Sequence, residues 1–342
     1  MERYMLMVGA MIAFLLSALI GHFLVPFLHK LKFGQTIKMT NGPKWHQNKQ
    51  GTPTMGGICF ILSSTIALGV VFTTLIFSRP QMFGTSQDMG LILCMFSAFG
   101  FGLIGFVDDY IKVVKKQNLG LGVWQKIIGQ VVVTLVLLGG LTLNGTLTTA
   151  ISLPGMGLVD LGWIFYPIAF LFIIFLVNAV NLTDGIDGLA SSVTFVVMLG
   201  YILLCGVLGY YHLSVYAACM AGALIGFLIY NFYPAKTFMG DTGSMFLGGL
   251  VTSMAFCLNR PELLIPLGCV YIWEAGCVVI QVSYFKFTKK FSKDHVGRRI
   301  FKMTPIHHSF ELRGWSEVKI VSVFSSIAAL GVLLASVWVF FS

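Results

Sequence analysis

Residues 163–206 read WIFYPIAFLFIIFLVNAVNLTDGIDGLASSVTFVVMLGYILLCG, in which a short turn with two aspartates joins two long apolar runs. Each run has about 20 residues, enough for a helix to cross a hydrocarbon core about 30 Å thick. Because the bilayer interior offers the backbone no water, such runs must form helices. The stretch therefore predicts membrane-spanning helices at 163–181 and 187–206, with the aspartates at the membrane boundary.

Similar runs recur along the whole chain, which is 57% hydrophobic and 10% charged, with a mean hydropathy of +0.87. A soluble domain of this size would carry about 25% charged residues. We expect an all-α integral membrane protein that forms one polytopic domain over residues 1–342 with ten transmembrane helices. The other eight spans are predicted at 4–28, 53–77, 90–109, 124–142, 212–230, 243–258, 262–284 and 318–341.

The basic residues set the predicted orientation. If both termini are periplasmic, every Lys and Arg falls in a cytoplasmic segment except Arg3, Arg79 and Arg260. This distribution follows the positive-inside rule. It predicts a long basic cytoplasmic loop at 285–317 and, on the other side, a small periplasmic hairpin at 143–162.

The net charge of +9 is spread over several loops between the spans. It therefore reflects topology and attraction to anionic lipid or phosphate rather than binding to nucleic acid.

Five aspartates gather at the predicted cytoplasmic ends of the helices: Asp108, Asp109, Asp184, Asp187 and Asp241. One such residue could be a helix cap, but ionisable groups at a membrane boundary are functional by default, and five on one side predict a cation site. Carboxylate and amide oxygens without a nearby thiolate favour a hard ion, Mg²⁺ or Mn²⁺. Amide oxygens are available at the same depth from Asn178, Asn181 and Asn231.

The adjacent Asp108 and Asp109 point about 100° apart on a helix, so we expect different partners for them. One would face the substrate, and the other a lysine or the metal.

Two glycine-bearing helix starts add a predicted anion site. Gly240 and Gly243 stand at one start, and Gly185 and Gly188 at the other. Free N–H groups at a helix N-terminus suit a phosphate.

The pair His307–His308 in the basic loop is not a zinc-protease motif, because HExxH is absent. It could bind phosphate when protonated, orient a substrate or shuttle a proton.

Five motifs carry a family resemblance: GTPTMGG at 51–57, VDDYIK at 107–112, NAVNLTDGIDGLA at 178–190, FMGDTGS at 238–244 and MTPIHHSFELRGW at 303–315. Together they resemble the bacterial phospho-N-acetylmuramoyl-pentapeptide-transferases, a branch of the polyprenyl-phosphate N-acetylhexosamine-1-phosphate transferases. Relatives that transfer N-acetylglucosamine phosphate share the aspartates, so that activity is an alternative. The run PIHHxxE followed by Gly-Trp resembles the muramoyl-pentapeptide branch.

The resemblance implies a reaction between UDP-N-acetylmuramoyl-pentapeptide and undecaprenyl phosphate that gives lipid I and UMP. It implies Mg²⁺ as cofactor, a homodimer, and a site facing the cytoplasm from the bacterial inner membrane. Two departures from the family pattern stand out. Ser309 replaces a third histidine, and the loop is longer around 289–297.

The resemblance also assigns residues. Mg²⁺ would be bound by Asp241 and Asn181. The uridine pocket would be built from Lys49, Asp187, Asn231 and Phe238, with Phe238 stacked on the base. The substrate cleft would be lined by Thr54, Asn178, Asp184 and Gln281. Asp108 is the candidate base, and the other implicated catalytic residues are Asp109, Asp241, His307 and His308.

Two questions stay open at this level. An ion-coupled transporter also uses intramembrane aspartates, but it predicts charges near the midplane and an internal repeat, and neither is evident. For a transferase, the lipid phosphate could attack directly, or an aspartate could first form a covalent intermediate. Direct attack is favoured because a metal-bound carboxylate is a poor nucleophile. A phosphomonoester is mostly ionised at pH 7, so Asp108 would position the acceptor or remove a residual proton.

Overall fold

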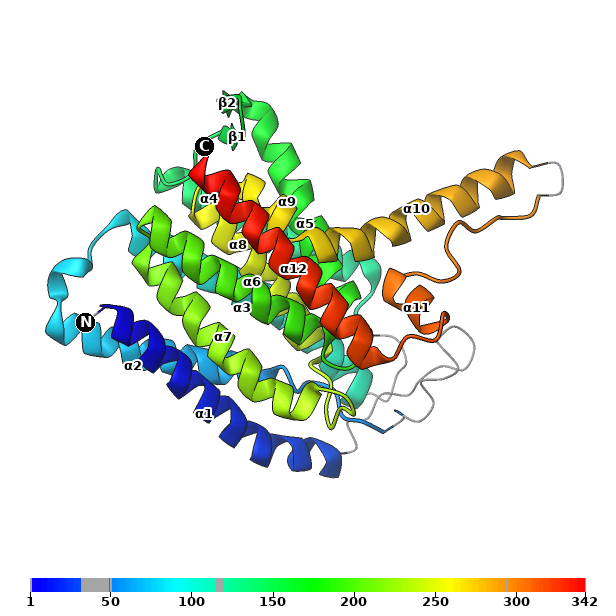
Figure 1. The fold of residues 1–342 in the computed structure, drawn as a ribbon, viewed down its shortest axis with the longest axis horizontal. Coiled ribbons are helices and arrows are strands. Elements are labelled where there is room, and N and C mark those ends of the chain that lie inside the picture. Colours follow the sequence, from blue (N-terminus) through cyan, green and yellow to red (C-terminus); the bar gives the residue numbers. More distant parts are fainter. Residues whose placement is uncertain (1, 32–48, 50, 115–119, 293–294, 342) are drawn as a thin grey trace.

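The computed structural model describes residues 2–31, 49, 51–114, 120–292 and 295–341 (Figure 1). Part of the predicted basic loops lies outside the described residues, namely Lys32, Lys38, Lys44, Lys115, Lys116 and Lys293.

Helices dominate the fold, and one small hairpin interrupts them. The helices are α1 (Glu2–Lys30), α2 (Ile58–Ser78), α3 (Ser86–Val114), α4 (Val123–Leu143), α5 (Phe165–Thr183), α6 (Leu189–Leu208), α7 (Tyr211–Asn231), α8 (Gly240–Cys257), α9 (Leu264–Leu267), α10 (Cys269–Phe291), α11 (Ile306–Glu311) and α12 (Glu317–Phe340). Short 3-10 turns cover Pro80–Met82, Gly162–Ile164 and Pro261–Leu263.

Within the described residues, eight helices are long and apolar enough to cross a membrane: α1 to α7 and α12. The bent pair of Pro261–Leu267 and Cys269–Phe291 adds a ninth candidate. An all-α integral membrane protein is therefore confirmed. The count of ten spans, the periplasmic termini and the single domain stay predictions.

Helix α8 covers the predicted span at 243–258 but is not apolar enough to count among the candidate membrane spans. Its 18 residues are long enough for a span, but its first turn is polar and it carries four glycines, Gly240, Gly243, Gly248 and Gly249. All its residues except Asp241 are buried, and it packs against α3 and α5. Because protein rather than lipid surrounds α8, its side chains need not be strongly apolar. The surrounding helices, including α3 and α5, thus enclose the N-terminus of α8 within the bundle.

The predicted span at 262–284 is not one straight helix, and its crossing of the membrane stays a prediction. The chain bends by 81° between the helical segments Pro261–Leu267 and Cys269–Phe291. Pro266 removes a backbone donor, and Gly268 separates the two segments, so the helix cannot continue straight. Helix α10 consequently leaves the body of the molecule, as Figure 1 shows.

The predicted loop at 285–317 is correspondingly shorter in the structure. Helix α10 continues to Phe291, and α11 forms within the remaining segment. Gln281 holds the returning chain against α10: its Oε1 accepts from the backbone N–H groups of Ile300 and Phe301, both at 3.0 Å.

The small hairpin is confirmed, and its periplasmic side stays a prediction. Strands β1 (Ala150–Leu153) and β2 (Gly157–Asp160) pair antiparallel, with Leu153 opposite Gly157. Gly155 and Gly157 have φ values of +78° and +71°, which suits the tight turn between the strands.

Candidate functional site

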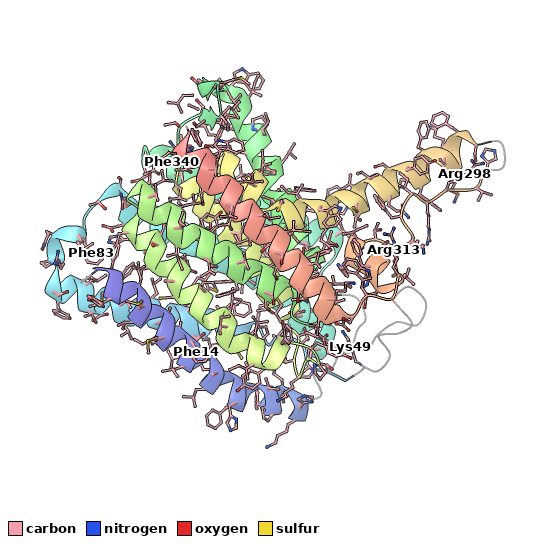
Figure 2. The ribbon with its side chains drawn as sticks, in the orientation of Figure 1. Phe14, Lys49, Phe83, Arg298, Arg313 and Phe340 are labelled. Atoms are coloured by element: carbon pink, nitrogen blue, oxygen red, sulfur yellow. The ribbon has the colours of Figure 1, made fainter. Side chains whose placement is uncertain are left out.

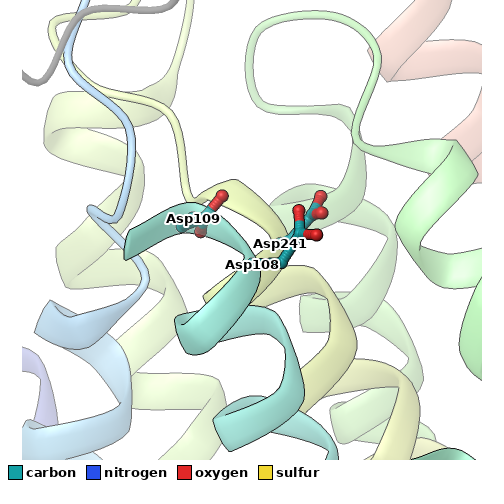
Figure 3. A group of neighbouring side chains, drawn as sticks. All are labelled: Asp108, Asp109 and Asp241. Carbon is teal, nitrogen blue, oxygen red and sulfur yellow. The ribbon is translucent and has the colours of Figure 1, made fainter. Parts of the chain in front are cut away.

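Three aspartates from two helices form the centre of the site. Oxygen atoms of Asp108, Asp109 and Asp241 lie within 4.8 Å of one another. Asp108 and Asp109 lie near the C-terminal end of α3, within about two turns of Val114, and Asp241 lies in the first turn of α8. Figure 3 shows Asp108 close to Asp241, with Asp109 on the other side of the α3 helix end.

Glycines allow α3 and α8 to approach closely enough to form this cluster. A Cβ atom at Gly105 would overlap the backbone carbonyl group of Asp241. Gly240 has a φ of +72°, a conformation that glycine adopts without strain, and it turns the chain into α8. The backbone therefore sets the distance between the carboxylates.

Two lysines bridge Asp108 and Asp241. The Lys112 Nζ lies 2.5 Å from Asp108 Oδ2 and 3.0 Å from Asp241 Oδ2. The Lys126 Nζ lies 3.1 Å from Asp108 Oδ1 and 2.9 Å from Asp241 Oδ2. The sequence predictions did not assign these lysines to the site, although the i,i+4 spacing of Asp108 and Lys112 was a usable signal.

Asp109 faces a different partner, as the 100° separation predicts. Its Oδ2 accepts hydrogen bonds from the Thr242 backbone N–H at 2.9 Å and the Thr242 hydroxyl at 2.8 Å. Asp109 therefore caps the start of α8, whereas Asp108 faces the lysines. A carboxylate at a helix N-terminus is favourably placed.

The predicted metal ligands lie together. The Asn181 side-chain amide donates to Asp241 Oδ1 at 3.0 Å and to the Ser244 hydroxyl at 2.8 Å. The carboxylates and this amide form an all-oxygen donor set, which fits Mg²⁺. To offer its oxygen to a cation, the Asn181 amide would have to rotate.

Excess negative charge in the same region also fits a cation. Desolvation of its carboxyl, together with the charges of Asp241, Asp109 and Asp187, raises the pKa of Asp184 to about 8. The neighbouring carboxylates thus add to the effect of burial on Asp184, and a divalent cation would offset their negative charge.

A second group of charged residues surrounds Lys49. Its Nζ lies 2.6 Å from Asp187 Oδ1 and 2.7 Å from Glu317 Oε2. The other Asp187 oxygen accepts the Ala235 backbone N–H at 2.8 Å. The structure therefore brings the predicted pocket residues Lys49 and Asp187 together. It adds Glu317 from α12, which the sequence predictions did not include.

Phe238 and Thr54 lie on paired backbone segments. The Phe238 N–H donates to the Pro53 carbonyl, and the Gly56 N–H donates to the Phe238 carbonyl, both at 2.8 Å. The Thr54 hydroxyl is buried without a hydrogen-bond partner in the part of the chain that the structure describes. An unpaired buried hydroxyl is costly, so a water or a bound ligand would be expected to supply the missing bond.

Asn231 holds the segment that precedes Phe238 in place. Its side-chain oxygen accepts the Ser191 hydroxyl at 2.7 Å, and its amide donates to the Thr237 carbonyl at 3.0 Å. It is buried and fixes the residue that precedes Phe238.

Two predicted cleft residues are engaged elsewhere. Asn178 lies exposed on α5 and exchanges hydrogen bonds with Gln130 of α4 at 3.0 and 3.2 Å. Gln281 binds the backbone of the chain that returns from α10, as described above. Their contact with substrate stays a prediction.

The two histidines take different partners. His307 Nδ1 lies 3.1 Å from both carboxylate oxygens of Glu274, and both side chains are fully buried. The other edge of this imidazole packs against Gly185, next to Asp184. His308 Nδ1 lies 2.6 Å from Glu311 Oε2. Glu274 was also missed, although a lone acid in an apolar run is a recognisable signal.

Comparisons with known proteins agree with the geometry. The sequence profile described as "Glycosyl transferase family 4" matches residues 91–259, and a "Phospho-N-acetylmuramoyl-pentapeptide-transferase signature 1" matches residues 49–61. Similar proteins named "Phospho-N-acetylmuramoyl-pentapeptide-transferase" include the following three. That of Heliobacterium modesticaldum is 45% identical over 95% of this chain and 96% of its own length. That of Halalkalibacterium halodurans is 40% identical over 99% of each, and that of Clostridium novyi 43% over 94% and 93%.

Proposed function

The chain belongs to the phospho-N-acetylmuramoyl-pentapeptide-transferase family, and from that membership we propose how its residues carry out the reaction. The enzyme transfers phospho-N-acetylmuramoyl-pentapeptide from UDP-N-acetylmuramoyl-pentapeptide to undecaprenyl phosphate, which gives lipid I and UMP. This is a membrane step of peptidoglycan synthesis, on which cell shape and division depend. The protein is accordingly an integral protein of the bacterial inner membrane.

The observation that carries the proposed mechanism is the cluster of Asp108, Asp109 and Asp241 with its two lysines. Donor diphosphate and acceptor phosphate are both anionic, so their mutual repulsion is the first obstacle to reaction. Mg²⁺, held by Asp241 and Asn181, would neutralise charge on the diphosphate. The ammonium groups of Lys112 and Lys126 would bind the phosphate oxygens and hold the reacting groups in line.

In the transfer step, an oxygen of undecaprenyl phosphate attacks the phosphorus that carries the sugar, and the bond from that phosphorus to UMP breaks. UMP leaves with the electron pair. Asp108 faces the lysines and would position the acceptor or accept a residual proton. A covalent aspartyl intermediate is disfavoured because Asp108 and Asp241 are both paired with the lysines and are weak nucleophiles.

For the donor, we assign the uridine pocket to Lys49, Asp187, Asn231 and Phe238. The contacts of Lys49 with Asp187 and of Asn231 with the segment before Phe238 support this assignment. Thr54 with its unpaired hydroxyl, Asp184, Asn178 and Gln281 would line the rest of the cleft. Asp109, His307 and His308 would support the reacting groups. We further propose that the site faces the cytoplasm, because nucleotide donors are cytosolic. We also propose that the protein is a homodimer.

Replacing Phe238 by alanine is expected to weaken donor binding, because the ring would no longer stack on uracil. Base stacking on an aromatic ring is worth about 1–3 kcal/mol, so the Kd for UMP should rise at least about fivefold. Phe291→Ala, at an exposed aromatic residue on α10, provides the control. Isothermal titration with UMP measures both variants, and equal affinities would contradict the stacking.

The reaction itself can be tested with purified protein in detergent. Donor, undecaprenyl phosphate and Mg²⁺ should yield UMP and lipid I in the absence of any ion gradient. An ion-coupled transporter would need such a gradient and would release no UMP. UDP-N-acetylglucosamine should not replace the donor. If it alone were used, the alternative transferase activity would be correct. Donor alone should leave no phospho-sugar bound to protein, and a trapped adduct would establish the covalent route.

A further inference from the structure

Glu317 connects parts of the molecule that are far apart in the sequence. It is the first residue of α12, and its Oε2 accepts a hydrogen bond from Lys49 Nζ at 2.7 Å. The same oxygen accepts the Asp187 backbone N–H at 2.9 Å. Since Lys49 also contacts the Asp187 carboxylate at 2.6 Å, the three residues form a closed triangle. Figure 2 shows Lys49 at the end of the bundle where α12 begins.

A purely structural role would also put an acid here. Acidic residues in the first turn of a helix interact favourably with its positive end. However, the cap of α12 is already supplied by Ser316, whose hydroxyl accepts the Lys319 N–H at 3.3 Å. The Glu317 side chain instead reaches across to Lys49 and to the turn that follows α5. Its contacts are therefore those of a residue that fixes the site.

The charge of the triangle indicates which part of the donor it faces. Among the described side chains, one ammonium lies between two carboxylates, so the group carries a net charge of −1. Such a group repels a diphosphate. The phosphates are better placed beside Lys112 and Lys126, and the uncharged nucleoside beside the triangle.

We propose that Glu317 is a positioning residue for donor binding. It holds the Lys49 ammonium and the turn that contains Asp187 in the geometry that binds the uridine. The proposal rests on the assignment of Lys49 and Asp187 to the uridine pocket. Glu317 contacts Lys49 and the Asp187 backbone, whereas we assign the phosphates to Lys112 and Lys126. Its loss therefore affects donor and UMP affinity and leaves kcat and the acceptor KM unchanged.

The test compares Glu317→Gln, Glu317→Asp, Lys49→Met and the double variant Lys49→Met/Glu317→Gln in the full-length protein. Isothermal titration gives the Kd for UMP, and steady-state kinetics give the donor KM and kcat. Each single variant should raise the UMP Kd about tenfold, because a charge-assisted contact is lost or misplaced. The UMP Kd of the double variant should be at most about twofold higher than that of the single variant that binds UMP less tightly. This is expected because Glu317 acts through Lys49.

Ser316→Ala is the matched control, since it removes the cap of the same helix without touching Lys49. It should lower the melting temperature and leave the UMP Kd unchanged. Glu317→Asp keeps the negative charge at the start of α12 but is one methylene shorter. It should therefore keep the melting temperature and still lose UMP affinity, which separates positioning from folding.

Three results would overturn the proposal or its premise. If Lys49→Met weakens UMP binding and Glu317→Gln and Glu317→Asp do not, the role of Glu317 is wrong and the uridine pocket stands. If the Glu317 variants change only the melting temperature, Glu317 is a helix-end residue and nothing more. If neither Lys49 nor Glu317 affects UMP or donor affinity, the assignment of the pocket itself fails.

Discussion

Replacing Asp241 by asparagine is expected to abolish turnover, with a loss of about a thousandfold or more in kcat. Asp241 faces Asn181 and both bridging lysines, so it is the carboxylate on which the cation and the phosphates converge. An asparagine keeps the size of the side chain but lacks the charge that a divalent cation requires. The dependence of the remaining activity on Mg²⁺ concentration should also weaken.

The loss should be catalytic rather than structural. Three carboxylates lie close together, so removing one charge reduces their repulsion, and the lysines keep Asp108 as a partner. The melting temperature of Asp241→Asn should therefore stay near that of the parent. Asp160→Asn, in the hairpin, is the matched control and should retain full activity. Chelation should inactivate the parent enzyme reversibly. Near-normal kcat in Asp241→Asn would remove this residue from the cation site.

Gly105→Ala is expected to lower kcat about a hundredfold although it adds a single methyl group. That methyl would overlap the Asp241 carbonyl, so α3 and α8 would have to separate. Overpacking of this kind costs about 1–3 kcal/mol of stability. A shift of about 1 Å at a reacting group can cost about a hundredfold in rate.

Gly139→Ala on α4 is the matched control, because a Cβ there has no atom within 4 Å. Formation of lipid I and thermal unfolding should be measured on both variants. The control should match the parent in both. If Gly105→Ala kept the parent kcat, the spacing of α3 and α8 would not be what positions Asp241.

Much of the architecture could be predicted because hydropathy measures how a helix partitions into lipid. That argument is strong for helices that face the bilayer. It is weaker for α8, which was predicted at 243–258 but is less apolar than a typical span because protein encloses it. The bend after Leu267 was missed because an apolar run shows only that a segment is buried in the membrane. Pro266 and Gly268 were the local signals that it would not be straight.

For the site, one-sided placement of the aspartates could be predicted because charges avoid the hydrocarbon core. The contact between Asp108 and Lys112 could also be predicted, because residues four apart in the sequence are neighbours on one face of a helix. The contact of Glu317 with Lys49 is different in kind. It depends on how the start of α12 packs beside the turn after α5, and no local pattern encodes that packing.

The polar, wholly enclosed α8 also bears on how the protein is made. A segment with an aspartate and several glycines gains little by moving alone from the translocon into lipid. Its partners α3 and α5 lie earlier in the chain, so both are synthesised before it and can receive it. We therefore expect membrane integration of α8 to depend on its association with α3 and α5, and the same association with α3 brings Asp241 to Asp108 and Asp109.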